Sequence, residues 1–293
     1  MKVSLEELIQ LKWQARRLSL PSRKKAMAIM GGAHHSGFRG HGMDFLETRR
    51  YLPGDDVRAI DWRVTARLKK THTKVFTEER ERPIFILVDY SSSMFFGTRK
   101  TFKSVIAAKA AALLAWAAAE QGDRVGGLVF SSDKSYQLRP QGGRHGVLRL
   151  LNALIQPISI SNDNKSNLTN ALVQLQRVTH PGSLIFIISD FQSMDKQAEK
   201  HLTKLARNNH IMGLFIYDQM EKNLPPPGTY DITNGQQYRI INSNSKELQA
   251  KYQKQFEEQQ CYLEKFFQQR QLHLLSLATD QEVVETIKSY NIL

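Results

Sequence analysis

Residues 84–93 read Ile-Phe-Ile-Leu-Val-Asp-Tyr-Ser-Ser-Ser, and this stretch decides the fold. Its first half is an unbroken apolar run, which predicts a strand buried on both faces in the middle of a parallel sheet. Asp89 follows at the carboxyl end of that strand, where open α/β sheets gather their ligand sites. Asp89, Ser91 and Ser93 offer one carboxylate and two hydroxyls, which are oxygen donors suited to Mg²⁺ or Mn²⁺. The stretch therefore predicts a central strand and part of a metal site.

The same polar residues have a simpler interpretation. Asp and Ser side chains accept hydrogen bonds from the free N–H groups of a helix, and a helical stretch follows at residues 103–120. The position directly after a buried strand favours the metal site over capping alone.

Apolar runs and helical periodicities alternate along the rest of the chain. We expect strands at 84–88, 124–130, 183–189, 212–217 and 273–278, and helices at 103–120, 144–155, 167–178, 196–208, 245–271 and 281–290. Strands separated by helices imply right-handed crossovers, so the predicted fold class is α/β with a doubly wound, mostly parallel sheet. Asn234-Gly235 predicts a small hairpin inserted near residues 228–242.

Residues 1–80 are expected to form an amino-terminal appendage, and residues 81–293 the sheet domain. The appendage is predicted to hold an amphipathic helix over 6–18, a glycine-rich loop over 31–42, and a Pro53-Gly54 turn between two short extended pieces. His34, His35 and His41 lie in the glycine-rich loop. We do not favour a transition-metal site there, because a flexible loop holds its ligands poorly.

Composition limits the classes of function. The chain has 293 residues, 41% of them hydrophobic, which is enough for a sizeable core. The single cysteine, Cys261, cannot form an internal disulfide, and we expect it to be a free structural thiol. Apolar runs fall short of a membrane span and residues 1–19 do not read as a signal peptide, so the expected location is cytoplasmic. The net charge of +13 favours acidic partners: nucleic acid, anionic membrane or an acidic protein surface.

Two other loops are expected to complete the metal site. Asp190 ends the apolar run 184–189, which places a second carboxylate at the same end of a neighbouring strand. We expect it to bind through a metal-bound water or to orient a hydroxyl. Ser166 precedes a predicted helix and offers a further hydroxyl, and Thr169 is the alternative.

Asp89, Ser91, Ser93, a later hydroxyl and Asp190 resemble, in this order, the metal-ion-dependent adhesion site of the von Willebrand factor A domain. The family usually has Thr where this chain has Ser166. The resemblance implies a von Willebrand factor A-like fold that binds a partner's carboxylate through the metal. A cation held by neutral hydroxyls and few carboxylates keeps positive charge and an open coordination position, which suits that use.

Residues 51–62 read Tyr-Leu-Pro-Gly-Asp-Asp-Val-Arg-Ala-Ile-Asp-Trp, a string that resembles the signature of bacterial proteins called domain of unknown function 58. In that family the segment precedes a von Willebrand factor A-like domain. Relatives are typically encoded beside MoxR-type AAA+ ATPases, so the resemblance implies partnership more than catalysis. The signature and candidate docking residues are Glu47, Arg50, Tyr51, Asp55, Asp56, Arg58, Asp61, Trp62 and Arg67.

The signature aspartates allow two interpretations. Asp55, Asp56 and Asp61 are expected to pair with the arginines at positions 49, 50, 58 and 67, either within the molecule or as a docking face. We favour the intramolecular network.

The leading hypothesis is a non-enzymatic cytoplasmic adaptor that binds an acidic protein segment through Mg²⁺ or Mn²⁺. Such an adaptor would work with a MoxR-type ATPase in complex assembly or stress response. One alternative is a metal-dependent phosphoesterase in which Asp89 and Asp190 hold the cation and water attacks. No general base is evident for it, since His145 and His180 lie on or near predicted helices.

The other alternative is nucleic-acid binding by the basic amino-terminal segment, where Tyr51, Trp62 and Phe76 interleave with Lys and Arg. We expect core packing for these aromatic residues instead.

Overall fold

The computed structural model describes residues 3–21, 43–78, 81–132, 134–156, 168–233 and 238–289. The chain divides into two compact units. The larger comprises Met1–Ile29 and Arg82–Leu293, and the smaller comprises Met30–Glu81.

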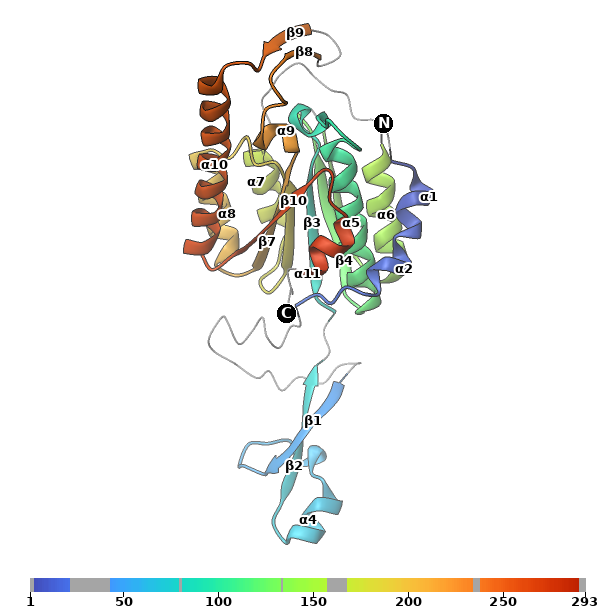
Figure 1. Ribbon diagram of the computed structural model, residues 1–293. Coiled ribbons are helices and arrows are strands. Elements are labelled where there is room, and N and C mark those ends of the chain that lie inside the picture. Colours follow the sequence, from blue (N-terminus) through green and yellow to red (C-terminus); the bar gives the residue numbers. More distant parts are fainter. Residues whose placement is uncertain are drawn as a thin grey trace. The chain divides into compact units, whose positions relative to one another are not determined.

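The larger unit is built on a six-stranded sheet with the order β10-β7-β6-β3-β4-β5 (Figure 1). Every neighbouring pair is parallel except β4 and β5, which are antiparallel. The predicted α/β class with a mostly parallel sheet is therefore confirmed. The strands are β3 (Pro83–Asp89), β4 (Arg124–Phe130), β5 (Ser135–Gln141), β6 (Leu184–Ser189), β7 (His210–Tyr217) and β10 (His273–Ala278).

Helices cover both faces of this sheet because alternate residues of its central strands point to opposite sides (Figure 1). Ile84, Ile86 and Val88 of β3 contribute to one core, whereas Phe85 and Leu87 contribute to the other. The first core includes α1 (Leu5–Gln10), α2 (Lys12–Ala15), α5 (Lys103–Glu120), α6 (Gly143–Ile155) and α11 (Val283–Ser289). The second includes α7 (Leu168–Val178), α8 (Lys196–Ala206) and α10 (Lys246–Gln269).

The remaining elements of the larger unit are short. They are the 3-10 helix η2 (Ser92–Phe95), α9 (Gln219–Lys222) and the antiparallel hairpin of β8 (Thr229–Thr233) and β9 (Tyr238–Asn242).

The amino-terminal helices pack against the sheet domain, whereas the sequence led us to expect them in the appendage. Leu8 and Ala15 are fully buried in the same core as α5 and α6. The indole N–H of Trp116 donates to the carbonyl oxygen of Leu8 at 3.1 Å, which fixes α1 against α5. Residues 1–29 accordingly group with the larger unit.

The smaller unit is a two-stranded antiparallel ribbon with helical turns between its strands. Its elements are β1 (Met43–Arg50), the 3-10 helix η1 (Val57–Ala59), α4 (Trp62–Leu68) and β2 (His72–Glu78). The prediction of a second extended piece after Pro53-Gly54 is wrong, because the segment that follows this turn forms η1 and α4. Asp56 caps η1, and the Asp61 side chain accepts hydrogen bonds from the amides of Arg63 and Val64 at the start of α4.

Within the part of the chain that the structure describes, no helix combines the length and the apolar character needed to cross a membrane.

Candidate metal site at the ends of β3 and β6

The candidate site lies where β3 and β6 run side by side. Val88 is in register with Ile188, so Asp89 and Asp190 leave the same edge of the sheet on adjacent strands. The chain continues from β3 to β4 on one side and later returns to β6 on the other side. This reversal is the topological switch point at which open α/β sheets form ligand crevices.

Asp89 organises the loop that follows β3. Its carboxylate is fully buried, and Oδ1 accepts the backbone N–H of Ser91 at 2.8 Å. Oδ2 accepts the hydroxyl of Ser189 at 2.6 Å, which ties the loop to the end of β6. The short helix η2 begins after Ser91 and brings the hydroxyl of Ser93 to 3.2 Å from that of Ser91.

Electrostatics at Asp89 indicate a carboxylate without enough positive charge around it. Burial and the neighbouring carboxylate of Asp190 raise the pKa of Asp89 to about 6, although hydrogen bonds from Ser189 and Ser91 act in the opposite direction. A cation at this position would offset the repulsion from Asp190 and stabilise the charged form of the buried Asp89 carboxylate.

Lys103, the first residue of α5, supplies one positive charge beside the site. Its side chain is fully buried, and Nζ lies 2.8 Å from Asp190 Oδ2 and 2.6 Å from Glu221 Oε1. Burial alone would lower the pKa of Lys103, but the two carboxylates outweigh burial and raise it. Lys103 is therefore held as an ammonium group.

The residues present fit a divalent cation. Adjacent ligands of an octahedral Mg²⁺, each about 2.1 Å from the metal, lie about 3 Å apart, which matches the spacing of the Ser91 and Ser93 hydroxyls. Asp190 and Glu221 share the ammonium of Lys103, and Asp89 adds a third carboxylate beside Asp190, so a dication would balance the formal charge of these four groups. Among the described residues no three His, Cys, Asp or Glu side chains are grouped to hold a metal. A cation here would therefore depend on the serine hydroxyls.

The structure brings together four of the five residues predicted from the sequence: Asp89, Ser91, Ser93 and Asp190. Ser166 lies outside the described residues, as do His34, His35 and His41. The hydroxyl of Thr169, the alternative to Ser166, donates to Asp195 Oδ1 at 3.0 Å beside the start of α8. Its side chain thus already has a partner.

Residues far from the metal motif were missed by the sequence reading. Lys103 reads as an ordinary lysine at the start of a helix, and only the structure shows that it is buried between two acids. Asp218 and Glu221 had a signal, since their spacing after an apolar strand is that of a capping box. The structure contains this capping box at the start of α9.

In the smaller unit, the signature aspartates mainly order the local backbone. Asp55 accepts Arg49 Nη2 at 2.7 Å and the backbone N–H of Leu52 at 2.8 Å. These two hydrogen bonds lower the pKa of Asp55, and the bond from Leu52 has the larger effect. Asp61 lies 3.8 Å from the ammonium of Lys74. The pairing of Arg49 with Asp55 therefore belongs to an internal network.

Other signature side chains are turned outward. Trp62, the first residue of α4, is 69% exposed, so the expectation that it packs in a core is wrong. The exposed signature residues are Glu47, Arg50, Asp56, Arg58, Trp62 and Arg67. The docking role of this face stays a prediction.

Comparison with solved structures gives low scores. The conserved hypothetical protein BatB from Bacteroides thetaiotaomicron is 15% identical with a TM-score of 0.44, over 71% of this chain and 96% of that one. An aerotolerance-related membrane protein from Bacteroides fragilis is 16% identical with a TM-score of 0.46, over 72% and 96%. Both structures are only distantly similar to this chain.

Sequence relatives are more informative. The chain is 30% identical over 217 residues to an uncharacterized protein of Mycobacterium tuberculosis, which covers 73% of this chain and 67% of the relative. An uncharacterized protein of Mycobacterium bovis gives the same values.

The family model described as protein of unknown function DUF58 matches residues 47–262, which include the signature segment and the candidate metal site. The observed six-stranded, mostly parallel α/β sheet agrees with the fold class that the resemblance implied. This chain belongs to the DUF58 family.

Proposed function

We propose that this protein is a non-enzymatic binding protein that uses a divalent cation, Mg²⁺ or Mn²⁺, to bind an acidic segment of a protein partner. Asp89, Ser91 and Ser93 would hold the cation directly. Asp190 would act through a metal-bound water or by orienting a hydroxyl. The cation would supply the positive charge that a carboxylate of the partner recognises.

The observation that supports this proposal is the convergence of a buried carboxylate, two hydroxyls and a second carboxylate at the switch point of the sheet. Neutral hydroxyls make up much of the donor set, so a bound cation would keep part of its charge. An acidic side chain from outside could then complete the coordination.

The partner that the family resemblance suggests is a MoxR-type AAA+ ATPase, with a role in complex assembly or stress response inside the cytoplasm. The exposed part of the signature segment is the proposed second contact with that partner. Purification of the protein from its host in magnesium and in chelator, followed by mass spectrometry of co-eluting proteins, tests this partnership.

The metal is tested by calorimetric titration of Mg²⁺ and Mn²⁺ into the wild-type protein and into Asp89→Asn, which keeps the shape of the side chain and removes its charge. We expect Asp89→Asn to weaken metal binding by at least about tenfold, because a direct charged ligand is lost. Asp280→Asn is the matched control, since Asp280 pairs with Arg99 at 3.4 Å and is not in the candidate donor set.

The bridge is tested with an immobilised peptide rich in Asp and Glu. Its capture by the wild-type protein should require magnesium, disappear in chelator and be lost in Asp89→Asn. Equal capture in magnesium and chelator, or wild-type metal affinity in Asp89→Asn, would contradict the proposal.

A further inference from the structure

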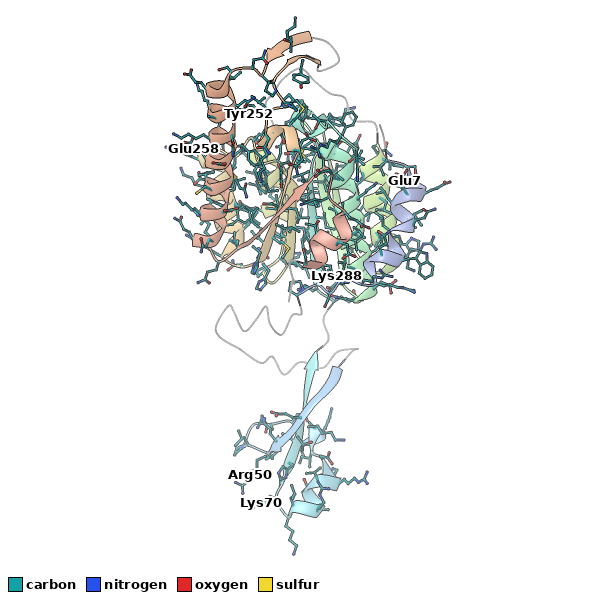
Figure 2. All side chains as sticks on the ribbon, viewed as in Figure 1. Glu7, Arg50, Lys70, Tyr252, Glu258 and Lys288 are labelled. Carbon is teal, nitrogen blue, oxygen red and sulfur yellow. The ribbon has the colours of Figure 1, made fainter. Side chains whose placement is uncertain are left out.

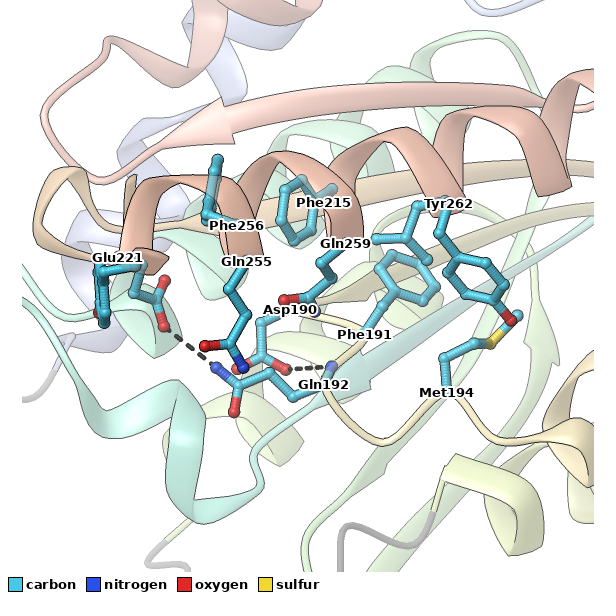
Figure 3. Close-up of a pocket in the computed structure, with 12 residues that line it drawn as sticks. Asp190, Phe191, Gln192, Met194, Phe215, Glu221, Gln255, Phe256, Gln259 and Tyr262 are labelled. Carbon is cyan, nitrogen blue, oxygen red and sulfur yellow. Dashed lines mark hydrogen bonds between the residues drawn. The ribbon is translucent and has the colours of Figure 1, made fainter. Parts of the chain in front are cut away.

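A cavity of about 480 Å³ opens beside the candidate metal site, between the loop after β6, strand β7 and helix α10 (Figure 3). Asp190 contributes both to this cavity and to the metal site. Gln192 and Glu221 lie on the same side, and Gln255 and Gln259 of α10 face them across the opening. The cavity belongs to the larger unit alone.

The charge of the cavity is opposite to that of the chain. The protein carries a net charge of +13. Its described cavity lining nevertheless contains two carboxylates, Asp190 and Glu221, and neither Lys nor Arg. Lys103 lies fully buried behind these acids and contacts one oxygen of each. Tyr262, on the cavity wall, donates its hydroxyl to Glu199, so a further acid stands beside it.

The acids on the cavity wall are fixed in position before any ligand arrives. The backbone N–H of Gln192 donates to Asp190 Oδ1 at 3.2 Å, and its side-chain amide donates to Glu221 Oε1 at 3.2 Å (Figure 3). The backbone N–H of Asp218 holds Glu221 Oε2 at 2.8 Å. Carboxylate and glutamine oxygens accept several hydrogen bonds each, so acceptor capacity is left for a donor from outside.

Aromatic rings form the rest of the wall. These rings come from the loop after β6, from β7 and from α10. They are Phe191, Phe215, Tyr252, Phe256 and Tyr262. Tyr252 on α10 is labelled in Figure 2. Phe215 and Phe256 lie 6.0 Å apart between ring centroids and continue to Tyr217 as one aromatic cluster. Aromatic ring faces attract cations, and they attract a planar guanidinium group most effectively.

We propose that this cavity binds an arginine side chain of the protein partner. A guanidinium group presents five N–H donors and one positive charge, which meet the acidic and amide oxygens, while its plane stacks on the aromatic wall. Because Asp190 joins the cavity to the metal site, the partner segment would carry an arginine close to the acidic residue that reaches the cation. That second statement rests on the proposed function, whereas arginine binding by itself does not.

The test is a methyl NMR titration of the 293-residue protein labelled with ¹³C-methyl methionine, in chelator and low salt. Met194 lines the cavity and is the reporter, and Met194→Leu assigns its signal. The probe is Nα-acetyl-arginine amide, and its neutral isostere Nα-acetyl-citrulline amide is the control. We expect the arginine compound to shift the Met194 signal with a dissociation constant on the order of millimolar, the range for so small a ligand. We expect the citrulline compound to bind at least about tenfold more weakly.

Two variants of α10 sharpen the test. Gln255→Arg places a guanidinium group at the exposed rim of the cavity and should weaken arginine binding at least about fivefold. Gln253→Arg adds the same group to the same helix, where Gln253 donates to Glu257 and does not line the cavity, and should leave binding unchanged.

The proposal is overturned if the arginine compound gives no saturable shift, if citrulline binds equally well, or if the two variants behave alike. Since the titration contains no free divalent metal, its outcome is separate from that of the metal experiments. If the cavity binds arginine but the acidic peptide is not captured in a metal-dependent way, only the proposed function is contradicted.

Discussion

Lys103 is unusual because its side chain is fully buried. Lysine is almost never fully buried unless it is paired, and here the ammonium lies between two carboxylates at 2.6 and 2.8 Å. A buried ion pair contributes little net stability, but removal of one partner leaves the other charge uncompensated. Lys103 thus controls how much negative charge the candidate metal site presents.

Replacement of this lysine by the uncharged Lys103→Met should lower stability by about 3–5 kcal/mol in chelator, because Asp190 and Glu221 lose their shared cation. Magnesium should restore a larger part of the melting temperature in this variant than it adds to the wild-type protein, since a dication can replace the lost charge. Thermal unfolding with and without magnesium measures both effects. An identical magnesium shift in the two proteins would mean that Lys103 and the cation do not share these acids.

Asp218 is a second buried residue, and its partners outside the capping box are visible only in the structure. Its fully buried carboxylate accepts the hydroxyl of Thr98 at 2.5 Å, that of Thr279 at 2.6 Å and the backbone N–H of Met220 at 2.9 Å. Burial alone would raise the pKa of Asp218, but these hydrogen bonds outweigh it and hold the pKa below the ordinary value.

Because the pKa of Asp218 is lowered in the folded state, its stabilising contribution is present above pH 4 or so and is lost as the pH falls through the folded value. Asp218→Asn should therefore be about 2 kcal/mol less stable than wild type at pH 7. The difference should shrink steadily as the pH is lowered below about 4. Urea unfolding across this pH range provides the measurement, and a difference that grows toward acid pH would contradict the assignment.

Among the secondary-structure elements, the central ones could be predicted because one local signal fixes each of them. The apolar runs of β3 and β6 specify strands buried on both faces, and their adjacency then brings Asp89 and Asp190 to one edge. Strand β5 was missed because it forms the antiparallel edge, with alternating burial and a proline at position 140.

Other features depended on contacts between distant parts of the chain. Asp190 meets Lys103 and Glu221 only when α5 and α9 are packed beside the end of β6, so the spacing of these residues in the sequence gives no sign of the contact. The packing of α1 in the sheet domain could not be predicted either. It depends on the contact between Leu8 and Trp116, which lie 108 residues apart in the sequence.

The role of α1 leads to a prediction for this element. Leu8→Ala should destabilise the protein by about 2–4 kcal/mol, because it opens a cavity in the core shared by α1, α5 and α6. Leu68→Ala is the control, since Leu68 is 50% exposed on α4 and its loss should change stability by less than about 1 kcal/mol. Chemical denaturation followed by circular dichroism compares the two. Equal effects would show that α1 is not an integral part of the sheet domain.

At the scale of the whole molecule, the two units differ in how much core they contain. The larger unit has an apolar core on each face of its sheet. Of the residues in the smaller unit whose burial is described, Thr73 is the buried one. A two-stranded ribbon with so little covered surface is marginally stable by itself.

Hydrogen exchange should reveal this difference directly. Amides of β1 and β2 should exchange at least about a hundredfold faster than those of β3 and β6, because central strands open only with the whole sheet. Mass spectrometry of exchanging peptides gives the comparison. Equal protection would indicate that the two units unfold together.

The carboxylate of Asp218 fastens three segments of the sheet edge to one another: the loop after η2 through Thr98, the start of α9, and the end of β10 through Thr279. The loop bearing Ser91 and Ser93 is thus anchored on its far side as well as by Asp89. A ligand that binds here meets a preorganised surface, so the protein loops lose little conformational entropy on binding. We therefore expect ligands to associate rapidly at this edge with little conformational change in the protein. Selectivity should come from complementarity of shape and charge.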